Sequence, residues 1–402
     1  MHIARMKLAI GHTRCLGLFL GLALAAPPMS AWAFPPPPPP PPRPATNAPV
    51  KPLTPEGANP SPKPAIQAIL SAFDHYEVVA MSAGHADKDM DDFIFRLIRN
   101  PAFPEKVDDI VVECGNSLYQ PLLDRYIAGA DVSLDDARKV WRNTTQPMCG
   151  VSGFYDQLFP LIRRINRTLP EPRKIRVLAG DPPIDWSKIR NHADLMRQDF
   201  SRDANIARVM ERQVLSKHRT ALMLFGVDHL FHDVKDSAVG KYERKYPGKT
   251  FVVAKHDGFG LGTPYEKYDR PFEKRMASWP SPSLVTLKGT WLADLLSKLP
   301  STTYSMTTKK GPNGHDITTY VPNDIDKVTA KTVDAYLYLG PARLALSEAI
   351  PAYIFLDTKY VHELRRRARI VDNPVYDQSL PSHVFDTDHS RFLHAPPPAG
   401  SD

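Results

Sequence analysis

Between Val78 and His256 the chain repeats one arrangement, in which a short apolar run is followed by polar residues. Segments in which apolar residues recur every three to four positions separate these runs, so the pattern predicts strands alternating with amphipathic helices. Such an alternation favours an α/β fold with a mostly parallel central sheet and helices on both faces. The predicted strands cover residues 76–81, 109–114, 174–179, 220–225 and 250–254.

The pattern is less regular over residues 265–370. Residues 284–287, 335–339 and 353–356 are further strand candidates, and residues 358–370 favour a helix. We expect one large domain over residues 65–370 that includes this C-terminal elaboration, followed by an irregular tail over residues 371–402.

Polar side chains stand just past the ends of the predicted strands. Parallel strands all end at one edge of their sheet, and ligands bind in the crevice there. The sequence therefore predicts one site assembled from distant parts of the chain. The residues concerned are His85, Glu113, Asn116, Asp181, Asp228, His229 and His256.

Two histidines, a carboxylate and an arginine are the candidates for chemistry at this edge. His85 lies on a tight turn after glycine, where an imidazole suits a general base. Glu113 interrupts an apolar strand, and a buried carboxylate is costly unless it pairs with a cation or binds a metal. His229 predicts a second acid-base group. Arg202, which opens a predicted helix, is expected either to bind an anionic group or to pair with Glu113.

The other polar residues at the strand ends, Asn116, Asp181, Asp228 and His256, are expected to bind substrate, although Asp181 precedes two prolines and also suits a turn. A metal, if one is bound, is expected on His85, Glu113 and His229. His232 follows His229 at the i+3 spacing that allows joint metal ligation.

Residues 1–33 have the pattern of a signal peptide. Basic residues precede the apolar stretch 16–26, and Ala31-Trp32-Ala33 fits a signal-peptidase site. The apolar stretch has about half of the roughly 20 residues that a bilayer span needs. We therefore expect an exported protein without a transmembrane span after cleavage, periplasmic in a Gram-negative host.

A proline-rich segment follows over residues 34–64 and begins with a run of prolines from Pro35 to Pro42. Such a segment is typical of a disordered, extended spacer that does not pair in a sheet. A scaffold that uses this spacer to reach a partner in the cell envelope is one hypothesis.

Charge and cysteine content narrow the function classes. The net charge is +7 at pH 7, and it is diffuse apart from arginines at positions 365–367 and 369. No basic stripe interleaved with aromatic residues occurs, so we expect a small molecule and no nucleic acid as partner, with the oligomeric state open. Cys114 and Cys149 remain after signal removal, and either a disulfide or two buried free thiols fits them.

Several segments, in this order, resemble the erythromycin-esterase-like superfamily, which includes the ChaN-like and TraB/Tiki proteins. They are VVAMSAGH (78–85), IVVE (110–113), RD (202–203) and GVDHL (226–230). Three more are similar to an uncharacterised exported bacterial subgroup: GNSLYQ (115–120), GDPPIDW (180–186) and DAYLYLGP (334–341). The resemblance implies a crevice in which a histidine, carboxylates and an arginine serve hydrolysis, with water activation in the esterases and a divalent metal in the Tiki proteases. ChaN-like members bind haem instead.

The chain departs from the family pattern at two places. The family's glutamate before the first histidine is replaced by Ser82 or Ala83, and Gly226 stands where the esterases have an extra histidine. Losing supporting groups can remove most of an enzyme's rate. Two hypotheses follow: an exported hydrolase of ester-like or amide-like bonds, or a protein without turnover that binds haem, a metal or a small ligand in the same crevice. Whether the protein is an enzyme is left open.

Overall fold

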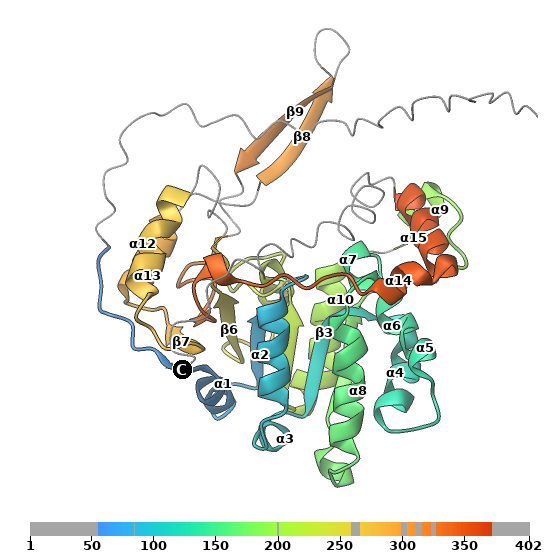
Figure 1. Cartoon of the computed structure of the whole chain (residues 1–402), viewed down its shortest axis with the longest axis horizontal. Helices are drawn as coiled ribbons and strands as arrows, with labels where there is room; N and C mark the ends of the chain where they lie inside the picture. Colours follow the sequence, from blue (N-terminus) through green and yellow to red (C-terminus); the bar gives the residue numbers. More distant parts are fainter. Residues whose placement is uncertain are drawn as a thin grey trace, which may run out of the picture. The chain divides into compact units, whose positions relative to one another are not determined.

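The computed structural model describes residues 55–83, 85–198, 201–258, 266–298, 304–310, 316–322 and 327–371 (Figure 1). The predicted signal peptide, most of the predicted spacer and the tail after residue 371 lie outside the described residues. The described part belongs to the compact unit Val50–Asp402. Among the described residues, no helix combines the length and the apolarity that crossing a membrane requires.

A mixed eight-stranded sheet, in the order β1-β7-β10-β6-β2-β5-β3-β4, forms the centre of the fold. The strands from β10 to β4 are mutually parallel, whereas β7 is antiparallel to both of its neighbours. The prediction of a mostly parallel sheet is therefore confirmed. The strands are β1 Lys63–Pro64, β2 Val78–Ser82, β3 Asp109–Asn116, β4 Arg176–Asp181, β5 Ala221–Phe225, β6 Thr250–Lys255, β7 Ser283–Thr286 and β10 Ala335–Tyr338.

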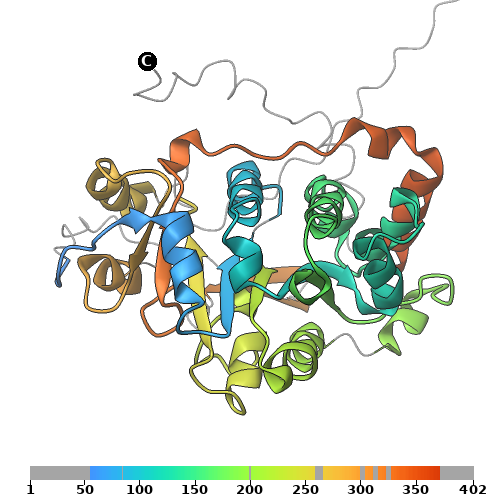
Figure 2. The ribbon, with the colours of Figure 1, turned by 90° about the horizontal axis from the view of Figure 1, so that it is seen from below.

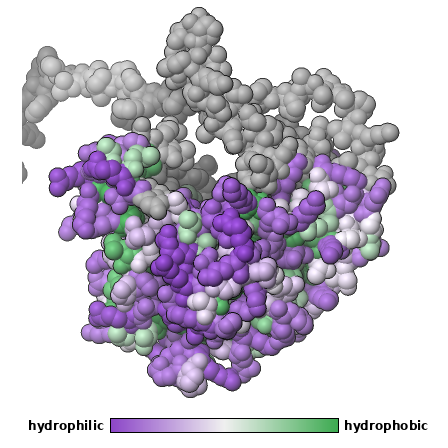
Figure 3. Space-filling view, turned by 180° about the vertical axis from the view of Figure 1, so that it is seen from behind, coloured by the Kyte–Doolittle hydropathy of each residue, from purple (hydrophilic) through white to green (hydrophobic). Residues whose placement is uncertain are grey.

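Helices cover both faces of this sheet (Figure 2). Along β2, Val79 and Met81 join a hydrophobic cluster with α2 and α8, while Val78 and Ala80 join a second cluster with α10 and α11. Because both faces are covered, the strand is apolar at every position except its last. The described surface seen in Figure 3 is mostly hydrophilic, with hydrophobic residues in small patches. These helices are α2 Lys88–Ile98, α8 Phe154–Asn166, α10 Arg202–Val209 and α11 Ala238–Glu243.

The remaining elements connect or flank this layered core. The α-helices are α1 Ala65–Ala72, α3 Phe103–Lys106, α4 Gln120–Ile127, α5 Leu134–Ala137, α6 Lys139–Arg142, α7 Pro147–Gly150, α9 His192–Met196, α12 Glu266–Met276, α13 Trp291–Lys298, α14 Ala352–Leu356 and α15 Thr358–Val371. A separate antiparallel hairpin consists of β8 Tyr304–Lys310 and β9 Asp316–Pro322.

Two stretches differ from the sequence-based expectation. The prediction of a strand at residues 353–356 is wrong, because these residues belong to α14. So short an apolar run has no period that separates a strand from a helix. The end of the predicted spacer, Lys63–Pro64, pairs with β7. Proline is tolerated there because β1 is an edge strand, where a missing N–H breaks no ladder.

After β10 and the short 3-10 helix Ala342–Leu344, the chain crosses the carboxyl edge of the sheet as an extended segment, which we call the strap (residues 345–351), and continues into α14 and α15 (Figures 1 and 2). The strap contacts the turn between β2 and α2. The backbone N–H of Glu348 donates to the carbonyl of Ala86 (2.9 Å), and that of Lys88 donates to the carbonyl of Leu346 (3.0 Å). The strap therefore holds the turn that carries His85.

Candidate functional site

The carboxyl ends of three adjacent strands bring the first candidate residues together. His85 lies on the turn after β2, and Glu113 lies within the last half of β3. His229 ends the short 3-10 helix Val227–His229, which follows β5. Since β5 lies between β2 and β3 in the sheet, the three side chains reach the same place.

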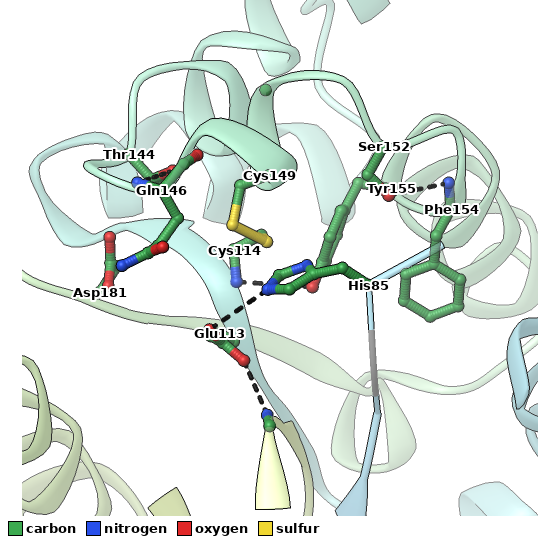
Figure 4. Close-up of a disulfide and its surroundings, with 12 residues drawn as sticks. His85, Glu113, Cys114, Thr144, Gln146, Cys149, Ser152, Phe154, Tyr155 and Asp181 are labelled. Atoms are coloured by element: carbon green, nitrogen blue, oxygen red, sulfur yellow. Dashed lines mark hydrogen bonds and ion pairs between the residues drawn. A yellow bond between two sulfur atoms is a disulfide. The ribbon is translucent and has the colours of Figure 1, made fainter. Parts of the chain in front are cut away.

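Glu113 is the centre of this cluster. Its side chain is only 6% exposed, and its Oε1 atom lies 2.8 Å from Arg202 Nη2, 3.7 Å from His85 Nε2 and 3.8 Å from His229 Nε2. The other oxygen accepts a hydrogen bond from the backbone N–H of Gly226 (2.7 Å). Figure 4 shows Glu113 below the ring of His85. Four groups, three side chains and one backbone N–H, thus surround a buried carboxylate.

These neighbours determine the charge of Glu113. Burial alone raises the pKa of a carboxyl group, but the neighbouring His85 and the charges of Arg202 and His229 outweigh it, and the pKa of Glu113 falls well below its usual range. Glu113 is therefore a carboxylate at neutral pH.

Arg202, the first residue of α10, connects two carboxylates. Its Nη2 atom donates to Glu113 and its Nε atom donates to Asp181 Oδ1 at 2.7 Å. Asp181 ends β4 and is fully buried, which raises the pKa of its carboxyl group, and the charge of Arg202 opposes this rise. The guanidinium is therefore oriented by groups from two strands.

His229 is held by Asp203 at one ring nitrogen and faces Arg202 with the other. Its Nδ1 atom lies 2.8 Å from Asp203 Oδ1, and its Nε2 atom lies 3.4 Å from Arg202 Nη1. Burial lowers the pKa of His229, but the hydrogen bond to Asp203 and the charge of Glu113 outweigh burial and raise this pKa above its ordinary value. Asp203 was not among the predicted site residues; its place directly after Arg202 at a helix start was the available signal.

His85 is the most exposed member of the cluster, with 34% of its side chain accessible. The next residue, Ala86, has a left-handed backbone (φ 56°), and the strap holds this turn. Beside the imidazole, Cys114 and Cys149 form a disulfide (Figure 4), which is the first of the two states that the sequence left open.

Two of the other predicted binding residues, Asn116 and His256, have partners outside the cluster around Glu113. Asn116 is buried, its Nδ2 donates to the carbonyls of Asn143 and Ile184, and its Oδ1 accepts from backbone N–H groups. His256 contacts Tyr336 and Glu273 with its two nitrogens (2.9 and 2.8 Å). Both side chains are therefore engaged with the protein itself.

Two further polar residues follow β5. Asp228 is exposed next to His229. His232 lies 2.8 Å from Glu243 and 2.9 Å from Asp334, one carboxylate on each ring nitrogen, so it does not share a site with His229.

The geometry is unfavourable for a metal held jointly by His85, Glu113 and His229. The guanidinium of Arg202 contacts both Glu113 and His229, and a permanent cation at this place repels a second one. Within the described ranges, one group brings three metal-ligand atoms within 4.8 Å of one another, namely His85, Cys114 and Cys149. For haem, the exposed imidazole of His85 is the member of the cluster suited to serve as an axial ligand.

Comparisons with known proteins give only distant likenesses. No protein-family model matches the chain, and no curated protein matches its sequence. Among solved structures, haem-bound ChaN of Campylobacter jejuni is 12% identical, with a TM-score of 0.32 over 50% of this chain and 88% of ChaN. A Bacillus cereus protein is 9% identical (TM-score 0.42, 73% of this chain and 97% of that one). The type III effector HopBA1 is 12% identical (TM-score 0.32, 51% and 88%). These likenesses assign no role to a residue of this chain.

Proposed function

We propose that the protein is an exported hydrolase that cleaves an ester-like or amide-like bond by histidine-assisted activation of water. The observation that carries the proposal is the convergence of His85, Arg202 and His229 on one buried carboxylate, Glu113, from separate strand ends. Ionisable groups whose environments shift their pKa values in opposite directions are typical of acid-base sites.

In this proposal His85 is the general base. Its ring is exposed enough to meet a water molecule, and the distance of 3.7 Å to Glu113 is within reach of a hydrogen bond that tightens when substrate binds. When His85 takes the proton of water, the ionised Glu113 stabilises the resulting imidazolium. The hydroxide formed at the same time attacks the carbonyl carbon of the substrate. The tetrahedral intermediate then breaks its C–O or C–N bond, and the leaving alcohol or amine takes the proton from the imidazolium of His85.

His229 and Arg202 serve the anionic side of the reaction. The Nε and Nη2 atoms of Arg202 are occupied by Asp181 and Glu113, so Nη1, which faces His229, is the part of the guanidinium left for an oxyanion. Protonated His229, oriented by Asp203, is a second donor. Preorganised donors of this kind stabilise a developing negative charge because they need no reorientation during the reaction.

A binding function without turnover is the second candidate, and one observation favours it. The charges of the cluster are already compensated internally, since Arg202 contacts two carboxylates and His229 contacts Asp203. In such a protein the exposed His85 would hold a haem, a metal or a small ligand, and the buried charges would orient it.

Turnover assays separate the two candidates. Purified protein is tested on a panel of activated esters and amides, beside His85→Ala and the control His75→Ala, which removes an exposed histidine outside the site. The hydrolase proposal expects His85→Ala to lose at least about 100-fold in kcat/KM with an unchanged melting temperature, and the control to keep its rate. Stoichiometric haem or metal uptake without turnover by the wild type would establish the binding function instead.

A further inference from the structure

The disulfide beside His85 joins a strand and a short helix at the carboxyl edge of the sheet. Cys114 lies on β3, directly after Glu113, and Cys149 lies on α7, with 5.3 Å between the Cα atoms. Both cysteines are fully buried, whereas His85 is partly exposed. The sulfur atoms and one nitrogen of His85 all lie within 4.8 Å of one another.

Two thiolates and an imidazole are a set of ligands that zinc and other thiophilic ions prefer. In a tetrahedral site with Zn–S distances of about 2.3 Å and Zn–N distances of about 2.0 Å, neighbouring ligand atoms lie roughly 3.5 Å apart. Side-chain rotations are therefore enough to convert the present cluster into such a site once the two sulfur atoms are no longer bonded to each other.

Glu113 adds a feature that metal-binding histidines commonly share. A ligating imidazole usually donates its second ring N–H to a carboxylate, which fixes the ring and its tautomer. Glu113 Oε1 lies 3.7 Å from His85 Nε2 and leaves Nδ1 for the metal. Figure 4 shows the imidazole between the disulfide and Glu113, so a single ring can face both.

We propose that the dithiol form of this protein binds one thiophilic metal ion through Cys114 Sγ, Cys149 Sγ and His85, and that the disulfide form does not. Three protein ligands leave a fourth position open to water or a small ligand, as in catalytic zinc sites. This proposed metal site does not depend on the proposal that the protein is a hydrolase. Metal and disulfide exclude each other, because a sulfur bonded to sulfur is no longer a thiolate.

The two forms are connected by a balanced reaction. A phosphine reductant breaks the S–S bond, both sulfurs become thiols, and phosphorus takes up the oxygen of one water molecule. Binding of Zn²⁺ then displaces the two thiol protons. A protein disulfide oxidant re-forms the S–S bond by thiol–disulfide exchange, its own disulfide is reduced to a dithiol, and the metal is released.

Metal competition tests the proposal on the full chain in a Cys15→Ser background, so that two cysteines remain. Phosphine-reduced protein, desalted without oxygen, competes with a chromophoric chelator for Zn²⁺, and Co²⁺ reports thiolate ligands through its charge-transfer absorption. Thiol titration after denaturation verifies reduction, and refolding under reductant supplies the dithiol form where native reduction is incomplete. We expect one Zn²⁺ per reduced chain and at least about 100-fold weaker binding by the oxidised chain.

Variants assign the ligands. His85→Ala is expected to weaken Zn²⁺ binding at least about tenfold and to change the Co²⁺ spectrum, while His75→Ala leaves both unchanged. Cys114→Ser with Cys149→Ser is expected to abolish the thiolate band. Equal Zn²⁺ affinity of the reduced and oxidised wild type, which requires no variant to fold, would overturn the proposal. Equal affinity of reduced wild type and His85→Ala would overturn it as well.

Discussion

At the scale of single residues, Glu113 owes its charge to the groups around it. The side chain is almost inaccessible, and its carboxylate contacts Arg202, the N–H of Gly226 and two imidazoles. A buried charge is tolerated because these groups replace the water that it has lost. Glu113 in turn compensates part of the charge of the mostly buried Arg202.

Glu113→Gln is therefore expected to lower the free energy of unfolding by about 3 kcal/mol, because it leaves the mostly buried Arg202 with Asp181 as its remaining carboxylate. Chemical denaturation at pH 7 measures this loss. Glu105→Gln is the matched control: Glu105 pairs with Arg173 at 3.2 Å, but both side chains are more than half exposed, and its loss should stay below about 1 kcal/mol. Equal losses for the two variants would contradict the account.

A second prediction at this scale concerns His232 and pH. Burial lowers the pKa of His232, but its hydrogen bonds to Asp334 and Glu243 outweigh burial and raise the pKa to about 9. The folded state thus holds a proton that the unfolded state releases near pH 6.5. The contribution to stability is complete below pH 6.5 and is lost as the pH rises to about 9, by up to about 3 kcal/mol.

Denaturation of wild type and His232→Gln between pH 6 and pH 10 measures this contribution. The difference in unfolding free energy between the two proteins should shrink as the pH rises through this window. A difference that is the same at both ends would contradict the ion-pair role of His232.

Which residues meet in the cluster could be predicted from the sequence only in part. Glu113 and His229 come together as expected. Glu113 interrupts one apolar run, His229 lies on the turn after another, and both runs end at the same edge of the sheet. The engagement of Asn116 could not be foreseen, since its partners Asn143 and Ile184 are distant in the chain. Asp203 was missed for the same reason: its role depends on His229, which lies on another element.

At the scale of elements, the strap and helix α2 are linked by two carboxyl groups. Glu348 of the strap and Asp91 of α2 lie close enough to influence each other, and burial is the main reason why the pKa of each carboxyl is raised. The strap also accepts and donates backbone hydrogen bonds at the turn of His85. The protonation state of Asp91 and Glu348 therefore affects the position of the turn that carries His85.

Asp91→Asn tests this link. Since the raised pKa of Asp91 makes the folded wild type lose stability as the pH rises above the usual carboxyl range, the variant should be more stable than the wild type at pH 9, by at least about 1 kcal/mol. At pH 4 the two proteins should differ less. Asp92→Asn, on the exposed side of the same helix, is the control without this gain.

Elements with a long apolar period were predictable, and short ones were not. Helix α2 has a buried stripe at Met90, Phe93, Ile94, Leu97 and Ile98, as its sequence indicates. In contrast, residues 353–356 form part of a five-residue helix whose buried Ile354 packs on Tyr360 and Leu364 of α15. That contact, and not the local sequence pattern, decides the conformation.

At the scale of the whole molecule, the order of the strands creates the cluster. β2, β5 and β3 are neighbours, although more than a hundred residues separate β3 from β5 in the chain. The sequence predicts a parallel sheet, because its strands alternate with helices, but it does not give this order. The order depends on the pairings of β5 with β2 and with β3, which join segments far apart in the chain.

The central claim is that side chains from these separate strand ends form one electrostatic unit. The most direct test is a pH titration of the imidazole resonances by NMR in the wild type and in Glu113→Gln. We predict that His229 titrates above its ordinary value in the wild type and that its pKa falls in the variant, because the charge of Glu113 3.8 Å away is removed. The resonances of His75, an exposed histidine outside the site, are the reference in both proteins. An unchanged pKa of His229 in the folded variant would contradict the account.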